Sequence, residues 1–215
     1  MEHNISVTRR ARYYSSGSLD TAATLWVVIH GYGQLAGEFV QGFGALVSPG
    51  CAVVAPEALN RYYKDKGEAG SHATTPVGTT WMTREYRDGE IADYVEYLDA
   101  VVQAERRPGV RLGVLAFSQG VATATRWVAC GNTQFDQVVM WAGQMAHDVD
   151  LAAARHRFPA GGIDLVLGTR DEFGEWIAVD RQAQRLSEAG IASRVLTFSG
   201  GHRLDDDTLR ALAAR

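Results

Sequence analysis

Cysteine is scarce in this chain of 215 residues. Cys51 and Cys130 lie far apart and outside any Cys-x-x-Cys or histidine-rich pattern, so the sequence indicates neither a disulfide framework nor a zinc site. There is also no His-x-x-x-His pair and no cluster of carboxylates, which disfavours a metal-dependent hydrolase. We therefore expect buried thiols in a reducing compartment, no metal and no other cofactor.

Long apolar runs and concentrated positive charge are also missing. No stretch approaches the 18 apolar residues of a membrane span, and the polar residues 1–12 lack the apolar core of a secretory signal. The net charge is −4 with acids and bases interspersed, a pattern without a basic stripe for nucleic acid or a polybasic tail for lipid. We predict a cytoplasmic protein with a small-molecule ester substrate, no nucleic-acid partner and no stable membrane anchor; whether it forms a homodimer stays open.

What the chain does contain is enough apolar sequence, 46% of its residues, to form the core of one large domain, 1–215. Apolar runs that predict strands occur at 25–30, 51–55, 112–117, 138–142, 163–167 and 193–198. Patterns that predict helices occur at 35–47, 83–106 with Thr83 as N-cap, 118–129, 175–189 and 204–214. A half-exposed strand is expected within 5–14 and a long polar loop at 60–80. The alternation predicts an α/β fold, a mostly parallel sheet with helices on both faces.

The sequence around Ser118 is central to this interpretation. A β-favouring run at 112–117 stops at the serine, and a helix-favouring segment follows it. Small residues stand two positions before and after, Ala116 and Gly120, where a sharply reversing backbone leaves little space. This is the steric pattern of the nucleophile elbow, G-x-S-x-G, with alanine at the first glycine. Taken alone, the serine could equally be a helix N-cap.

A glycine-rich turn, His30-Gly31-Tyr32-Gly33, follows the predicted strand at 25–30. Such a turn at the carboxyl end of a buried strand can direct backbone N–H groups into a site. We expect an oxyanion hole made by the N–H of Tyr32 or Gly33 and the N–H of Gln119, the residue after the serine. The alternative is a strand-to-helix turn without a functional role.

A serine hydroxyl needs a base to become a nucleophile, and the base needs a carboxylate to orient it. His202 follows the last predicted strand, whereas the other histidines lie in the terminal arm, in polar connections or in the glycine turn: His3, His30, His72, His147 and His156. Asp171 follows the strand at 163–167 and is favoured as the acid over Glu172, Asp148 and Asp150. Carboxyl ends of parallel strands share one sheet edge, which predicts that Ser118, Asp171 and His202 meet there.

The segments that carry these residues resemble those of the phospholipase/carboxylesterase group of α/β-hydrolases, which includes acyl-protein thioesterases and small bacterial esterases. They are His30-Gly31-Tyr32-Gly33, Ala116-Phe117-Ser118-Gln119-Gly120, Gly168-Thr169-Arg170-Asp171 and Gly200-Gly201-His202. The resemblance runs from about Leu25 to the C-terminus and departs from the usual Gly-Phe-Ser-Gln-Gly only at Ala116. It implies an α/β-hydrolase fold with little or no lid and a serine esterase activity.

Candidate substrate contacts are Trp81 and Met82, which follow the polar loop, and Trp141 and Gln144, which border the predicted strand at 138–142. Both segments also resemble those of bacterial members of the group. The predicted function is a carboxylesterase that acts on small substrates through a Ser-His-Asp triad and an acyl-enzyme. An acyl thioesterase or lysophospholipase with the same residues is one alternative, and a ligand-binding homologue without turnover is another.

Overall fold

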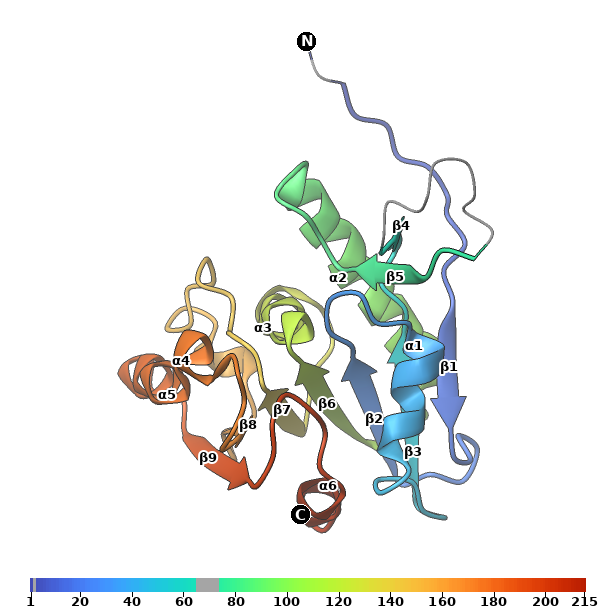
Figure 1. The fold of residues 1–215 in the computed structure, drawn as a ribbon. Coiled ribbons are helices and arrows are strands. Elements are labelled where there is room, and N and C mark those ends of the chain that lie inside the picture. The colour runs from blue at the N-terminus through green and yellow to red at the C-terminus, as the bar shows by residue number, and fades with distance from the viewer. Residues whose placement is uncertain (2, 65–73) are drawn as a thin grey trace.

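The fold is built on a seven-stranded sheet in the order β1-β3-β2-β6-β7-β8-β9 (Figure 1). The computed structural model describes residues 1, 3–64 and 74–215, so His72 and the rest of 65–73 lie outside the described residues. The strands of this sheet are β1 (Tyr13–Ser16), β2 (Thr24–Ile29), β3 (Cys51–Pro56), β6 (Arg111–Phe117), β7 (Gln137–Trp141), β8 (Ile163–Gly168) and β9 (Ser193–Phe198). Only β1 pairs antiparallel, with β3; the other pairs are parallel.

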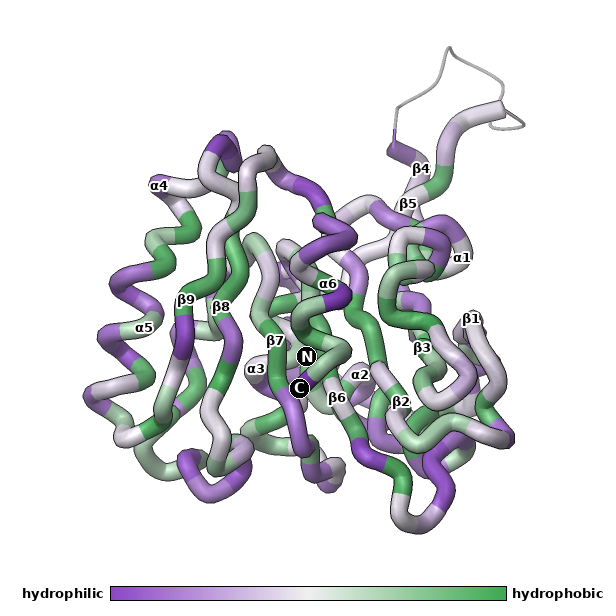
Figure 2. Tube along the Cα trace, turned by 90° about the horizontal axis from the view of Figure 1, so that it is seen from below, coloured by the Kyte–Doolittle hydropathy of each residue, from purple (hydrophilic) through white to green (hydrophobic). Residues whose placement is uncertain are grey.

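Helices cover both faces of the sheet, as predicted. The helical segments are α1 (Ala36–Phe39), the 3₁₀ helix η1 (Val40–Phe43), α2 (Arg87–Glu105), α3 (Gln119–Cys130), the 3₁₀ helix η2 (Arg155–Arg157), α4 (Gly174–Ile177), α5 (Val179–Glu188) and α6 (Asp206–Ala213). Along β2, Val27 packs into the apolar cluster beneath α2, α3 and α5, and Val28 packs into the cluster beneath α1, η1 and α6. Because successive side chains of a strand point to opposite faces, strands covered on both faces are mostly apolar, as β2 and β3 are along most of their length in Figure 2.

The structure corrects several predicted elements. Of the strand expected within 5–14, only its end lies in β1, and the helix expected at 35–47 is the short α1 followed by η1. The polar loop at 60–80 contains an antiparallel pair, β4 (Asn60–Tyr63) with β5 (Val77–Thr80). Thr83 is not the N-cap of α2. This helix begins after Tyr86, whose own backbone is left-handed (φ 47°). Ala178, also left-handed (φ 49°), divides the helix expected at 175–189 into α4 and α5.

The burial of the central strands predicts a large difference between two valine-to-alanine substitutions. Val28 is 0% exposed and Val195, on the edge strand β9, is 40% exposed. We expect Val28→Ala to lower the free energy of unfolding by about 2 kcal/mol, since it removes buried methyl groups and leaves a cavity. Val195→Ala should cost less than about 1 kcal/mol, mainly strand propensity. Urea unfolding followed by circular dichroism measures both; equal losses would contradict the assignment of β2 to the core.

Candidate active site

Ser118 lies between β6 and α3 in a backbone conformation that non-glycine residues rarely adopt (φ 54°, ψ −119°). Glycines make room for this sharp turn. A Cβ at Gly120 would lie 2.5 Å from the Ile29 carbonyl oxygen, and one at Gly143, after β7, would overlap the carbonyl oxygen of Ser118 itself. Ala116, by contrast, is fully buried within β6 in the main core cluster. The strained serine and the crowded glycines have the geometry of a nucleophile elbow.

The predicted Ser-His-Asp constellation is assembled in the structure. Nε2 of His202 lies 3.1 Å from Oγ of Ser118, and Nδ1 of His202 lies 2.9 Å from Oδ2 of Asp171. The Asp171 side chain is fully buried, and its Oδ1 accepts a hydrogen bond of 2.9 Å from the N–H of Phe173. Asp171 thus holds one imidazole nitrogen while the other faces the serine hydroxyl, an arrangement suited to general-base activation of that hydroxyl.

The segments that follow β8 and β9 pack closely against each other, which brings Asp171 to His202. A Cβ at Gly168, the last residue of β8, would overlap the carbonyl oxygen of Gly200, after β9. The N–H of Arg170 donates to that same oxygen at 2.8 Å. Glycine is therefore required where these exits touch, and the contact fixes the spacing between Asp171 and His202. The other acid candidates, Glu172, Asp148 and Asp150, make no hydrogen bond or ion pair with His202 among the described residues.

The glycine turn after β2 lies beside the serine. A Cβ at Gly31 would be 3.0 Å from Cβ of Ser118. The N–H of Gly31 donates to Oε1 of Gln34 at 2.7 Å, and the N–H of Gly33 donates to the carbonyl oxygen of Thr79 at 2.8 Å. Because Gly33 is engaged in this way, the geometry favours Tyr32 of the two candidate donors. Its N–H has no hydrogen-bond partner among the described residues.

Gln119 is the first residue of α3, so its backbone N–H has no partner within the helix. Its side chain is used differently: Nε2 donates to Oγ1 of Thr80 at 2.8 Å, and Oε1 accepts from the N–H of Trp81 at 3.3 Å. The residue after the serine therefore has a backbone N–H without a hydrogen-bond partner in the described part of the chain, while its side chain holds the end of β5 and the residue that follows it.

A cleft of about 770 Å³ opens over Ser118 and His202. Of the four predicted substrate contacts, Met82 and Gln144 line it, and Trp81 and Trp141 do not. Further lining residues that the sequence analysis did not identify come from the segment after Met82, from α3, from the turn after β7 and from α4: Thr83, Arg84, Arg87, Ala122, Thr123, Arg126, Met145, Ala146, His147, Phe173 and Trp176. Phe173 and Trp176 are exposed at its rim.

Trp81 and Trp141 are wrong as substrate contacts because both are buried. The indole N–H of Trp81 donates to the carbonyl oxygen of His30 at 2.9 Å, and that of Trp141 donates to the carbonyl oxygen of Arg203 at 3.0 Å. A buried indole requires such an acceptor. Each tryptophan thus fixes the backbone beside a residue of the site instead of facing the cleft.

One signal in the sequence could have located part of this lining. Ala122 and Arg126 follow Ser118 at intervals of four residues, which places them along one face of the helix that starts after the elbow. The segment around Arg84 and Arg87 follows Met82, whose position was predicted. No spacing relative to Ser118 or Met82 marks Phe173 and Trp176 as cleft residues in the sequence.

Within the described residues, no three His, Cys, Asp or Glu side chains are grouped so that they could hold a metal ion. Over the same residues, no helix has the length and apolar character that crossing a membrane requires.

Comparison with solved structures identifies the fold. A Zea mays acyl-protein thioesterase 2 is 18% identical, with a TM-score of 0.70 over 95% of this chain and 99% of that chain. A Bacillus cereus carboxylesterase is 14% identical, with a TM-score of 0.67 over 95% and 92%. An esterase, PE8, is 20% identical, with a TM-score of 0.64 over 96% and 97%. These similarities confirm the predicted α/β-hydrolase fold.

No curated protein matches the chain in sequence. A protein family does: the family described as serine hydrolase (FSH1) matches residues 27–206, from β2 to the start of α6. This match spans the elbow, the glycine turn, Asp171 and His202. The chain therefore belongs to the serine hydrolase (FSH1) family.

Proposed function

We propose that this protein is a carboxylesterase that acts through a Ser118–His202–Asp171 triad. The observation that carries the proposal is the pair of contacts made by one imidazole, 3.1 Å to the Ser118 hydroxyl and 2.9 Å to the buried Asp171 carboxylate. The strained elbow supports it as well, because it lifts this hydroxyl to the floor of the cleft. A serine that served only as a helix N-cap would accept a backbone N–H, and the Ser118 side chain makes no such cap.

The reaction follows from these positions. Oγ of Ser118 attacks the ester carbonyl carbon while Nε2 of His202 accepts the hydroxyl proton, and Asp171 stabilises the imidazolium that forms. The tetrahedral oxyanion is bound by the N–H groups of Gln119 and Tyr32. His202 then returns the proton to the departing alcohol, which leaves an acyl-enzyme. Water attacks this acyl group by the same route and releases the acid and free Ser118.

The cleft gives the substrate a largely apolar environment between the triad and its outer rim. Met82, Ala122, Met145 and Ala146 line this part of it. The same residues would accept an acyl thioester or a lysophospholipid, whose carbonyl carbon meets the same nucleophile. A panel of p-nitrophenyl esters and matched thioesters of increasing acyl length separates these substrates.

His30 is a positioning residue for the oxyanion turn in this account. It is fully buried; its Nδ1 lies 2.8 Å from the Gly31 carbonyl oxygen, and its Nε2 accepts from the N–H of Ala58 at 3.1 Å. These bonds require a neutral ring with the proton on Nδ1. Burial lowers the pKa of His30 to about 4, so the turn before Tyr32 keeps these bonds at neutral pH.

Ser118→Ala is the direct test of the nucleophile. We expect it to lower kcat for a p-nitrophenyl ester by about 10⁴-fold or more, as removal of a triad serine does. The free energy of unfolding should not fall below that of the parent, because serine and alanine are similar in size and the substitution leaves the packing intact. Steady-state kinetics and urea unfolding measure the two effects. Hydrolysis at the parental rate would show that Ser118 is not the nucleophile.

Asp171→Asn tests the orienting acid. We expect kcat to fall by about 10³- to 10⁴-fold, because an amide cannot hold the imidazole in the required tautomer or stabilise its charged form. Glu172→Gln is the matched control, since it removes the neighbouring carboxylate and should leave kcat within about twofold. If the two variants lose activity equally, or if only the control does, the assignment of the acid is wrong.

His30 predicts a pH dependence of stability. Its pKa is about 4 in the folded protein and near 6.5 in the unfolded chain. The unfolded state therefore binds more protons between these values, and the free energy of unfolding should fall as pH decreases from 6.5 to 4, by up to about 3 kcal/mol from this group. In His30→Gln the loss over this range should be smaller. Urea unfolding at several pH values checks this; an equal slope in both proteins would contradict the buried neutral histidine.

A further inference from the structure

Three arginines line part of the cleft. They are Arg84, Arg87 and Arg126, and no aspartate or glutamate is among the described residues that line it. The proposed mechanism uses none of these three side chains. A buried guanidinium group needs an internal partner, whereas an exposed one at the wall of a cleft is available to a ligand.

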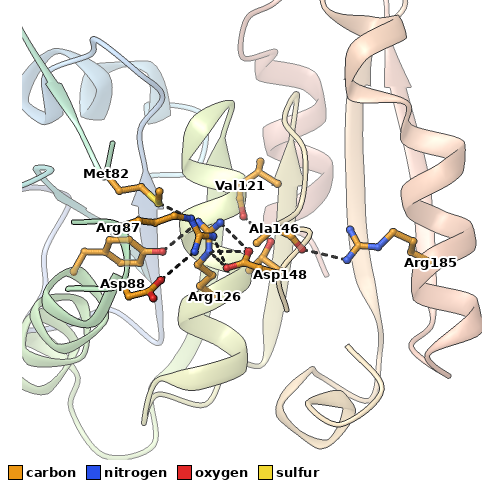
Figure 3. Close-up of polar contacts among 10 residues, drawn as sticks. Met82, Arg87, Asp88, Val121, Arg126, Ala146, Asp148 and Arg185 are labelled. Atoms are coloured by element: carbon orange, nitrogen blue, oxygen red, sulfur yellow. Dashed lines mark hydrogen bonds and ion pairs between the residues drawn. The ribbon is translucent and has the colours of Figure 1, made fainter. Parts of the chain in front are cut away.

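Arg126 has internal partners. Its side chain is 7% exposed, its Nη2 lies 2.9 Å from Oδ1 of Asp148, and its Nη1 lies 3.4 Å from the hydroxyl of Tyr94 (Figure 3). Burial opposes ionisation of Asp148, but hydrogen bonds from Arg126 and Arg87 outweigh it and keep the pKa of this carboxyl below its ordinary value. Asp148 is thus a fixed negative charge that compensates one arginine behind the cleft wall.

Arg87 and Arg84 are less well compensated. Arg87 shares the same Asp148 carboxylate through Nη2, and its Nη1 lies 3.2 Å from Asp88, whose side chain is 96% exposed. An ion pair in such an exposed position contributes little. Arg84 is exposed and makes no hydrogen bond or ion pair with the described part of the chain. Asp148 therefore pairs with Arg126 and Arg87 together, Arg87 has only the exposed Asp88 besides, and Arg84 has neither, so the uncompensated positive charge is on the two arginines that a ligand can reach.

The distance from the serine to this charge is set by α3. Ser118, Ala122 and Arg126 follow one another at four-residue intervals, so they lie along one face of the helix. Two turns separate the first from the last, about 12 Å along the axis. Ala122 and the thioether of Met82, 3.5 Å from Nη1 of Arg126, occupy the intervening wall. An apolar path thus leads from the nucleophile to the guanidinium groups.

We propose that the substrate carries an anionic group, a carboxylate or a phosphate, at the end of its chain remote from the scissile ester, and that Arg84 and Arg87 bind this group. The proposal rests on the esterase function above and specifies its substrate class. Arginine suits the role because its planar guanidinium donates two parallel hydrogen bonds to either anion. Arg126, held by Asp148, positions Arg87 through their shared carboxylate.

The kinetic test compares two substrates that differ only in this charge. They are the mono-p-nitrophenyl ester of suberic acid, with a free carboxylate, and its neutral methyl ester. We expect the parent protein to show the higher kcat/KM for the charged ester. In Arg84→Gln/Arg87→Gln, the ratio of kcat/KM for the charged ester to that for the neutral one should fall by about tenfold or more, because charge-assisted hydrogen bonds are lost.

Two variants control for charge and folding. Arg210→Gln removes an arginine on α6 that pairs with Asp206 and Asp207 and does not line the cleft, and it should leave the ratio unchanged. Arg84→Lys/Arg87→Lys keeps both charges and should retain most of the preference. The proposal is overturned if Arg84→Gln/Arg87→Gln keeps the parental ratio of kcat/KM values, or if Arg210→Gln lowers this ratio to the same extent as the double variant.

A binding experiment separates this proposal from the esterase function. Isothermal titration calorimetry on Ser118→Ala measures the binding of three compounds: the anions monomethyl suberate and octyl phosphate, and the neutral dimethyl suberate. We expect one or both anions to bind, the tighter one identifying the group, and binding to vanish when Arg84→Gln/Arg87→Gln is added. Anion binding without ester hydrolysis by the parent would refute only the esterase. Hydrolysis of neutral esters without arginine-dependent anion binding would refute only the anion site.

Discussion

The positive φ angle of Ser118 is the constraint on which the rest of the site depends. A φ of 54° at a non-glycine residue is unfavourable by itself, so the surrounding structure has to maintain it. The strand β6 ends on one side of the residue and α3 begins on the other, and Gly120 and Gly143 allow neighbouring backbone to approach the turn closely because they have no side chain. The same turn leads directly into α3, whose first residue is Gln119 and whose residues Ala122 and Arg126 line the cleft, so one local strain positions the proposed nucleophile, the proposed oxyanion donor and part of the cleft wall together.

Parallel strands bring the other groups to this turn. The exits of β2, β6, β8 and β9 share one edge of the sheet, and each exit is shaped by contacts of its own. Buried tryptophans fix two of them through single hydrogen bonds, Trp81 at His30 and Trp141 at Arg203. The site therefore lies on short, rigid loops tied to the core, which is what a preorganised catalytic constellation requires.

Much of this could be predicted from sequence because buried parallel strands are apolar runs, and because small residues mark the places where two backbones touch. The triad positions followed from those two signals. The failures have a common physical origin in tertiary context: the left-handed Ala178 interrupts an otherwise helical pattern, and the polar segment after Asn60 gains strand structure only by pairing with residues near Thr80. Aromatic residues near a predicted site were equally ambiguous, since a tryptophan side chain can pack in the core as well as contact a ligand.

The arginines of the cleft illustrate the same limit. In the sequence Arg126 is an ordinary helix residue, and only the fold shows that the turn after β7 places Asp148 against it. Arg87 is the first residue of α2, which begins after the left-handed Tyr86 and not at Thr83 as predicted. Charge at a site is thus decided by which carboxylates the fold brings close, not by the number of arginines in the chain. In this cleft Arg126 and Arg87 share the carboxylate of Asp148, and Arg87 has besides it only the exposed Asp88.

The most direct test of the central claim is to locate the activated serine chemically. After reaction of the folded protein with a fluorophosphonate, peptide mass spectrometry should find one adduct per chain, on Ser118, and none when the protein is unfolded in urea beforehand. An adduct on another serine, or no adduct on the folded protein, would contradict the claim that the strained elbow and His202 make this hydroxyl a nucleophile.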